Sequence, residues 1–415
     1  MYIKRTLENK IRNYLNKPEI LAIIGPRQSG KTTLLKEIIK SLENTSYITF
    51  EDREILDLFN NDIKTFYSLY GKNIKYLVID EFQYAKNGGQ KLKYLYDTYN
   101  IKIIISCSSA LDLTHQAVKY LVGRIFIFYL FSLTFEEFLI YRNPSLYENI
   151  YTDIQQKIYD YIYNKRIKPP VISREIINEI SKYYYEYNLF GGYPRVAIAK
   201  DKEEKITILK NIFNTYFLRE IRDILQLGSE DQLQKLIKAL ALQIGSTVVY
   251  NELCQISSLN YSNLLKHINI LEKTFVIKKI LPFYKNKRTE IAKSPKIYFL
   301  DNGFRNIVLN NFQEMDKRID RGNLNENFIV SQMLKKEYNI NYWRTKSGAE
   351  VDFIIELNNM IIAIEVKSIL GFNKIGKSLF TFKEKYSPGK IIILSENYSF
   401  FDKNKNVLFM PLFFM

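Results

Sequence analysis

Residues 21–33 read Leu-Ala-Ile-Ile-Gly-Pro-Arg-Gln-Ser-Gly-Lys-Thr-Thr, an apolar run followed by a loop with two glycines. Apolar residues at helical spacing follow from Leu34, so the local order is strand, loop, helix. Backbone N–H groups of such a loop converge on phosphate at the helix N-terminus, and the glycines permit close backbone approach. We therefore predict a nucleotide-binding loop made of Gly25, Pro26, Arg27, Gln28, Ser29, Gly30, Lys31, Thr32 and Thr33.

Two side chains of this loop have predicted roles. Lys31 can reach the β- and γ-phosphates of ATP as a catalytic residue, and the Thr32 hydroxyl can ligate Mg²⁺. The alternative is a glycine loop that serves only the fold. The strand before the loop and the helix after it favour nucleotide binding, so ATP and Mg²⁺ are the predicted cofactors.

A second apolar run, Tyr76–Ile79, ends in two acidic residues. Asp80 would hold Mg²⁺ through water, and Glu81 would polarise the attacking water as a catalytic residue. An acidic strand end is common on its own, so its weight comes from following the glycine loop in the same chain. Together the two motifs predict ATP hydrolysis.

Two weaker features follow the acidic pair. A third apolar run leads into Ser106-Cys-Ser-Ser-Ala, where Ser106 and Ser108 are candidates for sensing the γ-phosphate; a polar strand end is the equal alternative. Arg124 precedes a further apolar run and is a candidate charge-stabilising arginine, acting within or between subunits, or else a salt-bridged surface residue. The alternation of strands and helices predicts a mainly parallel sheet with helices on both faces.

Residues 230–300 show three helical patterns and then a hairpin pattern, which resembles a winged helix-turn-helix. Residues 261–273 would be the recognition helix. Its expected buried residues are Leu264, Leu265, Ile268 and Leu271, and its expected exposed ones are Ser262, Asn263, Lys266, His267 and Asn269. Basic residues flank the hairpin with one acid, Glu290: Lys278, Lys279, Lys285, Lys287, Arg288, Lys293 and Lys296. DNA binding is favoured, and a structural lid or a partner-docking module is the alternative.

Acidic residues recur in the C-terminal segment. Glu326 lies on a predicted helix, and Asp352 and Glu365-Val-Lys367 lie on the two strands of a hairpin. The series resembles the PD-(D/E)xK nuclease fold. This resemblance implies that Asp352, Glu365 and Glu326 hold Mg²⁺ and that Lys367 orients or activates water, with Asp352, Glu365 and Lys367 as catalytic residues. The alternatives are a solvated strand face with a cross-strand ion pair, and a related fold that binds without cutting.

Across nearly its whole length the chain resembles a large prokaryotic family of AAA-type ATPases with a C-terminal domain of uncharacterised function. Members of that family usually have glycine where Cys107 stands here. The resemblance implies ATP binding. The motifs that carry it include the glycine loop, Ile79-Asp-Glu-Phe-Gln83, Gly123-Arg124, Gly191-Gly-Tyr-Pro-Arg195 and Trp343-Arg-Thr-Lys-Ser-Gly-Ala-Glu-Val-Asp352.

We predict a multidomain α/β chain with four segments. Pro169-Pro170 lies in a tyrosine-rich helical stretch and marks an exposed break. The predicted segments are a P-loop ATPase domain at 1–145, a helical linker at 146–229, a winged helix-turn-helix at 230–305, and a restriction-endonuclease-like α/β domain at 306–415.

Composition bounds the partners and the compartment. The 415 residues include 60 Lys and Arg against 44 Asp and Glu, a net charge of +16 that favours polyanions, with DNA first. An AT-rich genome would produce part of this lysine excess. Neither a signal peptide nor a membrane-spanning run is recognisable, and two distant cysteines suggest no disulfide framework, so a cytoplasmic protein without a membrane partner is expected.

Two functional readings remain open from the sequence. One is an ATP-driven enzyme that handles DNA; the other is a nucleotide-switch or signalling ATPase whose C-terminal modules bind proteins or nucleic acid without cleavage. Self-association is compatible with both, because AAA-type relatives often form rings. No protein partner is indicated.

Overall fold

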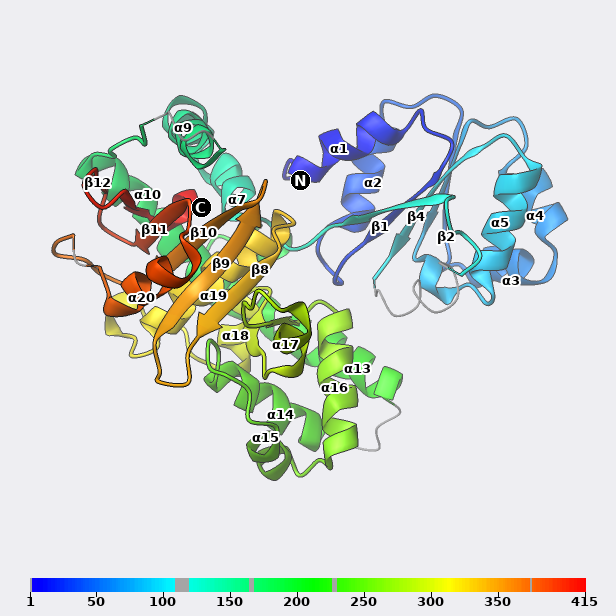
Figure 1. Cartoon of the computed structure of the whole chain (residues 1–415). Coiled ribbons are helices and arrows are strands. Elements are labelled where there is room, and N and C mark those ends of the chain that lie inside the picture. Colours follow the sequence, from blue (N-terminus) through cyan, green and yellow to red (C-terminus); the bar gives the residue numbers. More distant parts are fainter. Residues whose placement is uncertain (1, 109–118, 164–167, 226–229, 374) are drawn as a thin grey trace. The chain divides into compact units, whose positions relative to one another are not determined.

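The computed structural model describes residues 2–108, 119–163, 168–225, 230–373 and 375–415 (Figure 1). The chain forms two compact units. The N-terminal unit contains Met1–Leu133, Tyr193–Arg195 and Asn269–Val276, and the C-terminal unit contains Thr134–Gly192, Val196–Ile268 and Ile277–Met415. None of the described helices is long and apolar enough to cross a membrane.

The N-terminal unit is built on a five-stranded sheet in the order β2-β3-β4-β1-β5. Every neighbouring pair is parallel, so the carboxyl ends of all strands lie at one edge. The loop after strand β1 therefore opens at the same sheet edge as the ends of β3 and β4. The strands are β1 (Ile20–Ile24), β2 (Thr45–Thr49), β3 (Tyr76–Asp80), β4 (Lys102–Cys107) and β5 (Ile125–Tyr129).

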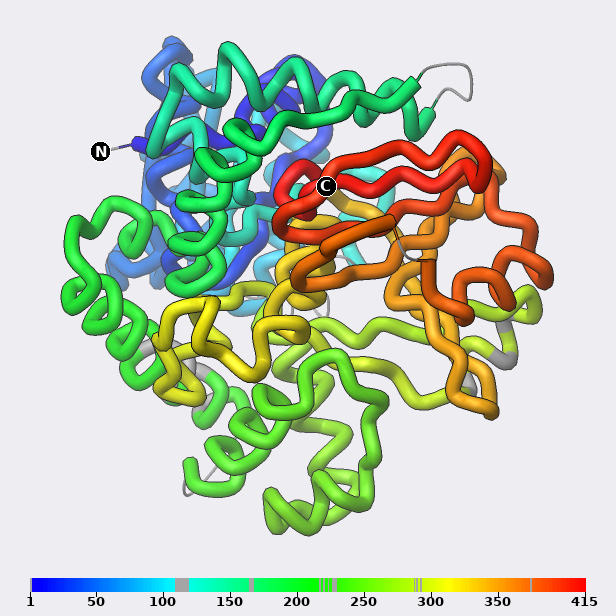
Figure 2. Tube along the Cα trace, turned by 90° about the vertical axis from the view of Figure 1, so that its left-hand side faces the viewer, coloured from blue at the N-terminus to red at the C-terminus, as the bar shows by residue number. Residues whose placement is uncertain are grey.

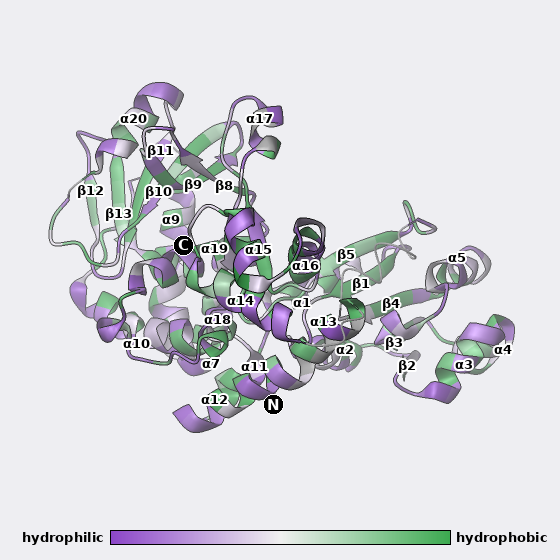
Figure 3. Ribbon diagram, turned by 90° about the horizontal axis from the view of Figure 1, so that it is seen from below, coloured by the Kyte–Doolittle hydropathy of each residue, from purple (hydrophilic) through white to green (hydrophobic). Residues whose placement is uncertain are grey.

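Helices cover both faces of this sheet, as predicted. Alternate residues of β1 point to opposite faces: Ala22 packs with Phe59, Phe66 and Leu92 of one core, and Ile23 packs with residues of the other. The first core involves α3 (Arg53–Asn61), α4 (Ile63–Tyr70) and α5 (Gly88–Thr98), and the second involves α1 (Thr6–Tyr14) and α2 (Lys31–Ile39). Figure 3 shows the predominantly hydrophobic colouring of β1 and β5.

The C-terminal unit contains a six-stranded mixed sheet in the order β12-β13-β11-β10-β9-β8. Strands β8, β9 and β10 are antiparallel, whereas β10, β11 and β13 are parallel. Helix α20 (Lys377–Tyr386) packs Leu379 and Phe382 against one core of the sheet. The strands are β8 (Ile340–Arg344), β9 (Glu350–Leu357), β10 (Met360–Val366), β11 (Lys390–Ser395), β12 (Phe400–Asp402) and β13 (Val407–Pro411).

The tyrosine-rich helices belong to the same unit and pack on its last residues. Tyr151 is buried, and its hydroxyl donates a 2.7 Å hydrogen bond to the Phe413 carbonyl. Figure 2 shows the C-terminal strands beside these helices. Residues predicted to form a linker thus contribute core side chains. The elements are α7 (Phe135–Arg142), α8 (Pro144–Leu146), η3 (Tyr147–Tyr151), α9 (Thr152–Tyr163), α10 (Arg174–Phe190), α11 (Pro194–Ile198), α12 (Lys202–Asn211), η4 (Ile212–Phe217) and α13 (Leu218–Leu225).

Three helices and an antiparallel strand pair follow. They are α14 (Asp231–Leu242), α15 (Tyr250–Ser257), α16 (Tyr261–Lys273), β6 (Ile277–Ile280) and β7 (Lys296–Phe299), with α17 (Lys287–Ala292) between the two strands. The chain then continues through α18 (Asn302–Val308), η5 (Met315–Lys317) and α19 (Arg321–Lys335) to the mixed sheet, and it ends in η6 (Leu412–Phe414).

Candidate nucleotide-binding site

The glycine loop joins the end of β1 to the start of α2. A Cβ on Gly25 would lie 1.9 Å from the Leu130 carbonyl oxygen, so no larger residue fits there without displacing backbone. Gly30 has a φ of +95°, a left-handed conformation that L side chains rarely adopt. Both positions thus favour glycine on steric grounds. Without a Cβ at either position, the loop backbone can approach a ligand closely.

The remaining loop residues lie between these glycines and the first turn of α2. Lys31 is buried, and its ammonium donates to the carbonyls of Gly25 and Pro26 at 2.9 and 3.0 Å. Arg27 donates to the Tyr84 hydroxyl at 3.4 Å, and Gln28 has a positive φ of 60°. The Lys31 ammonium therefore lies within the curve of the loop, where phosphate oxygens would replace carbonyls as its acceptors.

Thr32 and Asp80 are brought into contact by neighbouring elements. The Thr32 hydroxyl donates a 2.7 Å hydrogen bond to Oδ2 of Asp80 at the end of β3. Asp80 is only 2% exposed. A hydroxyl and a carboxylate side by side are hard oxygen ligands of the kind Mg²⁺ prefers, so the pair fits this ion.

Asp80 receives further hydrogen bonds from two neighbouring strands. The Tyr47 hydroxyl, from β2, donates to Oδ2 at 2.7 Å, and the Ser106 hydroxyl, from β4, donates to Oδ1. Burial raises the pKa of Tyr47, and the hydrogen bond to Asp80 raises it further, so the phenol remains a proton donor. Ser106 thus touches the carboxylate, whereas Tyr47 was not singled out in the sequence.

Glu81 follows Asp80 in a conformation unusual for a residue with a side chain. Its φ of 54° and ψ of 43° are left-handed, which costs of order 1 kcal/mol. Its N–H donates to Oδ1 of Asp80 and to Oγ of Ser106, both at 3.1 Å, and its carboxylate accepts from Nε2 of Gln83. The left-handed backbone of Glu81 thus forms the turn from β3 into η1 (Phe82–Tyr84).

Gln83 and Arg5 lie beside the site, and neither is predicted from the sequence as a functional residue. Oε1 of Gln83 accepts from the Ser108 N–H at 3.2 Å. The guanidinium of Arg5, only 5% exposed, donates to the carbonyls of Ser29 and Phe131, both at 2.7 Å. Residues Ser109 and Ala110 of the sensor segment lie outside the described residues.

Arg124 lies at the opposite edge of the sheet from the glycine loop. Its carbonyl accepts from the N–H of Ile20, the first residue of the five-residue strand β1, so roughly 16 Å of strand separates it from the loop. Its Nε donates to Asp97 at 2.9 Å. The predicted role within its own subunit is therefore corrected, because the side chain is a salt-bridged surface arginine. An action on another copy remains a prediction.

The C-terminal acidic residues lie near one another, but each has a different partner. The Asp352 carboxylate accepts from the Val366 N–H at 2.7 Å, and Glu326 accepts from the Tyr298 hydroxyl at 3.2 Å. Glu365 pairs with Lys367 at 2.6 Å, which places these two on one sheet face as predicted. We call Glu326, Asp352 and Glu365 the acid cluster.

Burial dominates the electrostatics of this cluster. It raises the pKa of Glu326 to about 8, with the Asp352 charge adding to the effect, and it raises the pKa of Asp352 to about 6. Among the residues that the structure describes, no group of three or more His, Cys, Asp or Glu side chains is arranged to hold a metal ion. The three-carboxylate Mg²⁺ site that the resemblance implies therefore stays a prediction, and the three carboxylates here contact Val366, Tyr298 and Lys367.

The predicted recognition helix needs two corrections. His267 is buried, with Nδ1 2.7 Å from the Asn263 carbonyl, whereas Leu265 is exposed. Burial lowers the pKa of His267. The other predicted surface residues of α16, namely Ser262, Asn263, Lys266 and Asn269, are exposed.

The basic residues around the β6–β7 pair differ in exposure. Lys285, Arg288 and Lys293 are exposed, and Lys278 and Lys279 are half-buried. Lys296 is a further correction, because it is buried and its ammonium pairs with Glu350. The side chain of Lys287 lies outside what the structure describes.

Three family models match parts of the chain. Residues 17–139 match an AAA domain, and residues 181–315 and 321–413 match two domains of unknown function, DUF8612 and DUF4143. The chain is 26% identical to an uncharacterised protein of Methanocaldococcus jannaschii over 98% of this chain and 86% of that protein. It is 25% identical to one of Haemophilus influenzae over 88% and 85%.

Similar solved structures include nucleotide-binding proteins. The Walker-type ATPase of Pyrococcus abyssi is 15% identical with a TM-score of 0.47, covering 74% of this chain and 96% of that one. The ADP form of the Aeropyrum pernix ORC2 protein is 14% identical with a TM-score of 0.33, covering 67% and 87%. The segment 17–139 therefore resembles an AAA domain, because it matches that family model and its parallel sheet carries the glycine loop directly after strand β1.

Proposed function

We propose that the protein binds ATP with Mg²⁺ at residues 25–33 and hydrolyses it. The observation that carries this proposal is the 2.7 Å contact between the hydroxyl of Thr32 and the carboxylate of Asp80, from two motifs far apart in sequence. Magnesium, when bound, neutralises charge on the phosphates. Lys31 binds the β- and γ-phosphates, Thr32 and Asp80 hold the ion, and Glu81 orients and polarises the attacking water.

The direct test is phosphate release from ATP by the full-length protein, with and without Mg²⁺. Lys31→Ala should weaken ATP binding, and Glu81→Gln should slow turnover while ATP still binds. Lys64→Ala, on the exposed side of α4, is the matched control for loss of a lysine charge. Wild-type protein that neither binds nor hydrolyses ATP would overturn the proposal.

A second candidate function is DNA binding by the winged-helix-like region 231–299. It is supported by the exposed polar side chains of α16 together with the exposed Lys285, Arg288 and Lys293 near the strand pair. Phosphate contacts from such residues are sensitive to salt. Binding of a DNA duplex should therefore weaken steeply with ionic strength and should weaken in Arg288→Ala. The outcome against it is equal affinity at low and high salt.

For the domain that contains the acid cluster, we favour binding of proteins or nucleic acid without cleavage over nuclease activity. This choice is supported by the separate partners of Glu326, Asp352 and Glu365 and by the absence, among the described residues, of a three-ligand metal group. The test is nicking of supercoiled DNA with Mg²⁺ or Mn²⁺, with and without ATP. Cleavage by the wild type that disappears in Asp352→Ala would reverse the choice and establish a nuclease.

A further inference from the structure

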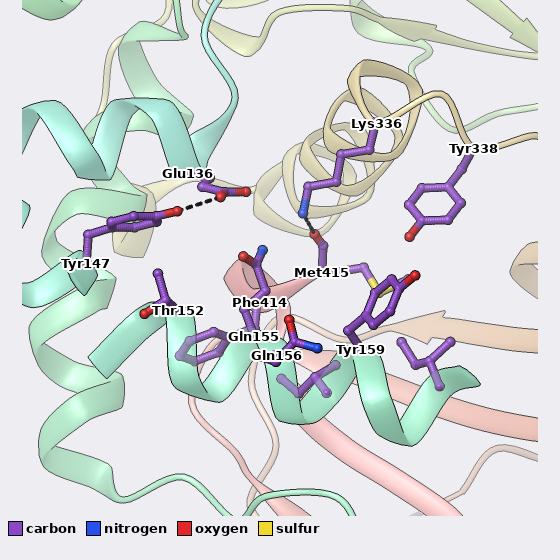
Figure 4. Close-up of a pocket in the computed structure, with 12 residues that line it drawn as sticks. Glu136, Tyr147, Thr152, Gln155, Gln156, Tyr159, Lys336, Tyr338, Phe414 and Met415 are labelled. Atoms are coloured by element: carbon purple, nitrogen blue, oxygen red, sulfur yellow. Dashed lines mark hydrogen bonds between the residues drawn. The ribbon is translucent and has the colours of Figure 1, made fainter. Parts of the chain in front are cut away.

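Two parts of the molecule hold polar groups to which the proposed function gives no role. One is a cavity of about 440 Å³ in the C-terminal unit (Figure 4). There, the Lys336 ammonium donates to the main-chain oxygen of Met415 at 2.8 Å. The Glu136 carboxylate accepts from the Tyr147 hydroxyl, also at 2.8 Å, so the protein itself satisfies both charges. The other is Gln83, which lies beside the nucleotide site.

The Gln83 side chain bridges the ends of two neighbouring strands. Its Nε2 donates to Oε2 of Glu81, which follows β3, and its Oε1 accepts from the Ser108 N–H, which follows β4, at 3.2 Å. Strands β3 and β4 are parallel, so both partners lie at the sheet edge where the glycine loop opens. One planar amide thus uses its donor and its acceptor together and ties the Glu81 carboxylate to the backbone after β4.

The short helix η1, which carries Gln83, is itself held on two sides. Phe82 is buried, and its ring centroid lies 5.7 Å from that of Phe50 in the core. The Tyr84 hydroxyl accepts from Arg27 of the nucleotide loop at 3.4 Å. The middle residue of this turn is therefore presented to Glu81 from a fixed position.

The contact leaves Glu81 able to act on water. A carboxylate accepts hydrogen bonds through two oxygens, and Gln83 bonds to Oε2, so Oε1 can accept from a water molecule. A glutamate side chain without a partner samples several rotamers. The bond from Gln83 restricts this freedom while it keeps one oxygen available, which is the arrangement expected of a support for the carboxylate rather than of a block.

We propose that Gln83 is a positioning residue for ATP hydrolysis, which holds the Glu81 carboxylate so that Oε1 accepts a hydrogen bond from the attacking water. This inference rests on the proposed function. In the reaction the water oxygen bonds to the γ-phosphorus while the bond from that phosphorus to the β–γ bridging oxygen breaks, which gives ADP and phosphate. Gln83 acts through Glu81, so its loss slows this step and leaves ATP binding as it is.

The test is steady-state phosphate release by the full-length protein with Mg²⁺, together with calorimetric titration of ATP. Gln83→Met keeps the length of the side chain and removes both hydrogen bonds. We expect kcat to fall about 10- to 100-fold, as for a misplaced catalytic group, while the affinity for ATP stays close to that of wild type. Gln90→Met, exposed in the first turn of α5, is the matched control and should behave as wild type.

A second variant separates the two ends of the amide. Gln83→Glu keeps an acceptor for the Ser108 N–H but places a carboxylate against Glu81 where the donor was. Its kcat should be at least as low as that of Gln83→Met, because like charges repel. A wild-type kcat would show that only the Ser108 contact matters and would contradict the proposal. This variant also decides the question if Gln83→Met does not fold.

The combination with Glu81→Gln shows whether the two residues act as a unit. In single-turnover measurements, Gln83→Met should cause little further loss once Glu81 is replaced. An equal fractional loss in both backgrounds would mean that Gln83 acts independently of Glu81, and the proposal would be wrong. Wild-type protein without ATP turnover would overturn the proposed function as well, whereas wild-type turnover with an unchanged kcat in Gln83→Met would overturn this inference alone.

Discussion

The nucleotide site and the acid cluster both contain poorly exposed carboxylates on strands, but they differ in what surrounds them. Asp80 accepts hydrogen bonds from Thr32, Tyr47, Ser106 and the Glu81 backbone. Asp352 has one backbone donor from Val366, and burial raises its pKa to about 6. Hydrogen-bond donors offset the cost of burying a carboxylate. The Asp80 carboxylate is therefore held by donors from several elements, whereas Asp352 has a single backbone donor.

Of the substitutions that test this comparison, one at Asp80 should have the largest effect, which is a loss of ATP turnover. Asp80→Asn removes the charge but keeps the shape of the side chain, so Mg²⁺-dependent hydrolysis should fall roughly 100-fold or more. Steady-state phosphate release measures this change. Asp97→Asn, the surface partner of Arg124, is the control and should be near wild type. A small effect of Asp80→Asn would show that this carboxylate is not part of the hydrolytic site.

The steric fit of the loop can be tested next. Gly25→Ala places a Cβ 1.9 Å from the Leu130 carbonyl oxygen, which cannot move without the backbone of the strand exit. We expect the free energy of unfolding to fall by about 1–3 kcal/mol, as for other overpacked positions. Denaturant titration measures it. Gly371→Ala meets no atom within 4 Å and should be nearly neutral; equal losses for both variants would contradict the steric argument.

The acid cluster should make the free energy of unfolding depend on pH. Because the pKa of Glu326 is raised to about 8 in the folded protein, the native state holds a proton that the unfolded state releases at lower pH. The free energy of unfolding should therefore decrease as pH rises from about 4.5 to 8. Glu326→Gln removes this contribution, and its stability relative to wild type should grow over the same window, by on the order of 1 kcal/mol for each pKa unit.

Denaturant titrations at several pH values measure this difference. Glu384→Gln, on the exposed face of α20, is the matched control and should follow the wild-type profile. If the difference in free energy of unfolding between Glu326→Gln and wild type is constant from acidic to mildly basic pH, Glu326 titrates normally and the prediction is wrong.

A substitution in strand β2, beside the nucleotide site, should have a smaller effect on the affinity for Mg²⁺. Tyr47→Phe removes only the hydroxyl that donates to Asp80. The loss of one hydrogen bond is worth about 0.5–1.5 kcal/mol, so the apparent affinity for Mg²⁺ should fall several-fold while turnover at saturating Mg²⁺ stays close to wild type. The reverse pattern, a loss of turnover that excess Mg²⁺ does not restore, would give Tyr47 a direct part in hydrolysis.

The smallest effect should come from Arg124→Ala. An exposed ion pair is worth at most about 1 kcal/mol, and this one lies at the edge of the sheet remote from the loop. ATP turnover should therefore be nearly unchanged over a range of protein concentrations. A large loss that depends on protein concentration would instead show that Arg124 acts on the site of another copy.

Local patterns predicted what local structure determines. The strand, the loop and the helix at residues 21–39 follow one another in sequence, so hydrophobic periodicity and two glycines sufficed. Parallel order also brought Asp80 to the correct sheet edge. Tyr47 and Arg5 could not be found in this way, because each meets the site through a neighbouring element and their spacing carries no signal.

Burial of charged and polar residues was the harder problem. Lys296 resembled its exposed basic neighbours in sequence, yet it pairs with Glu350 from a different strand. His267 occupies a helix position beside core residues, and its polarity suggested the wrong face. A motif specifies which residues are available, whereas their side-chain partners depend on contacts distant in sequence.

Arg5 gives the nucleotide loop a mechanical link to the strand exit. One planar guanidinium bonds the Ser29 carbonyl within the loop and the Phe131 carbonyl beyond β5, each at 2.7 Å. Because the guanidinium is rigid and bonded to both carbonyls, the two carbonyls cannot shift independently without breaking a hydrogen bond. Phe131 lies three residues before Thr134, whose side chain caps α7. A displacement of the Ser29 carbonyl would therefore be felt at Phe131, two residues before this stretch of the N-terminal unit ends at Leu133.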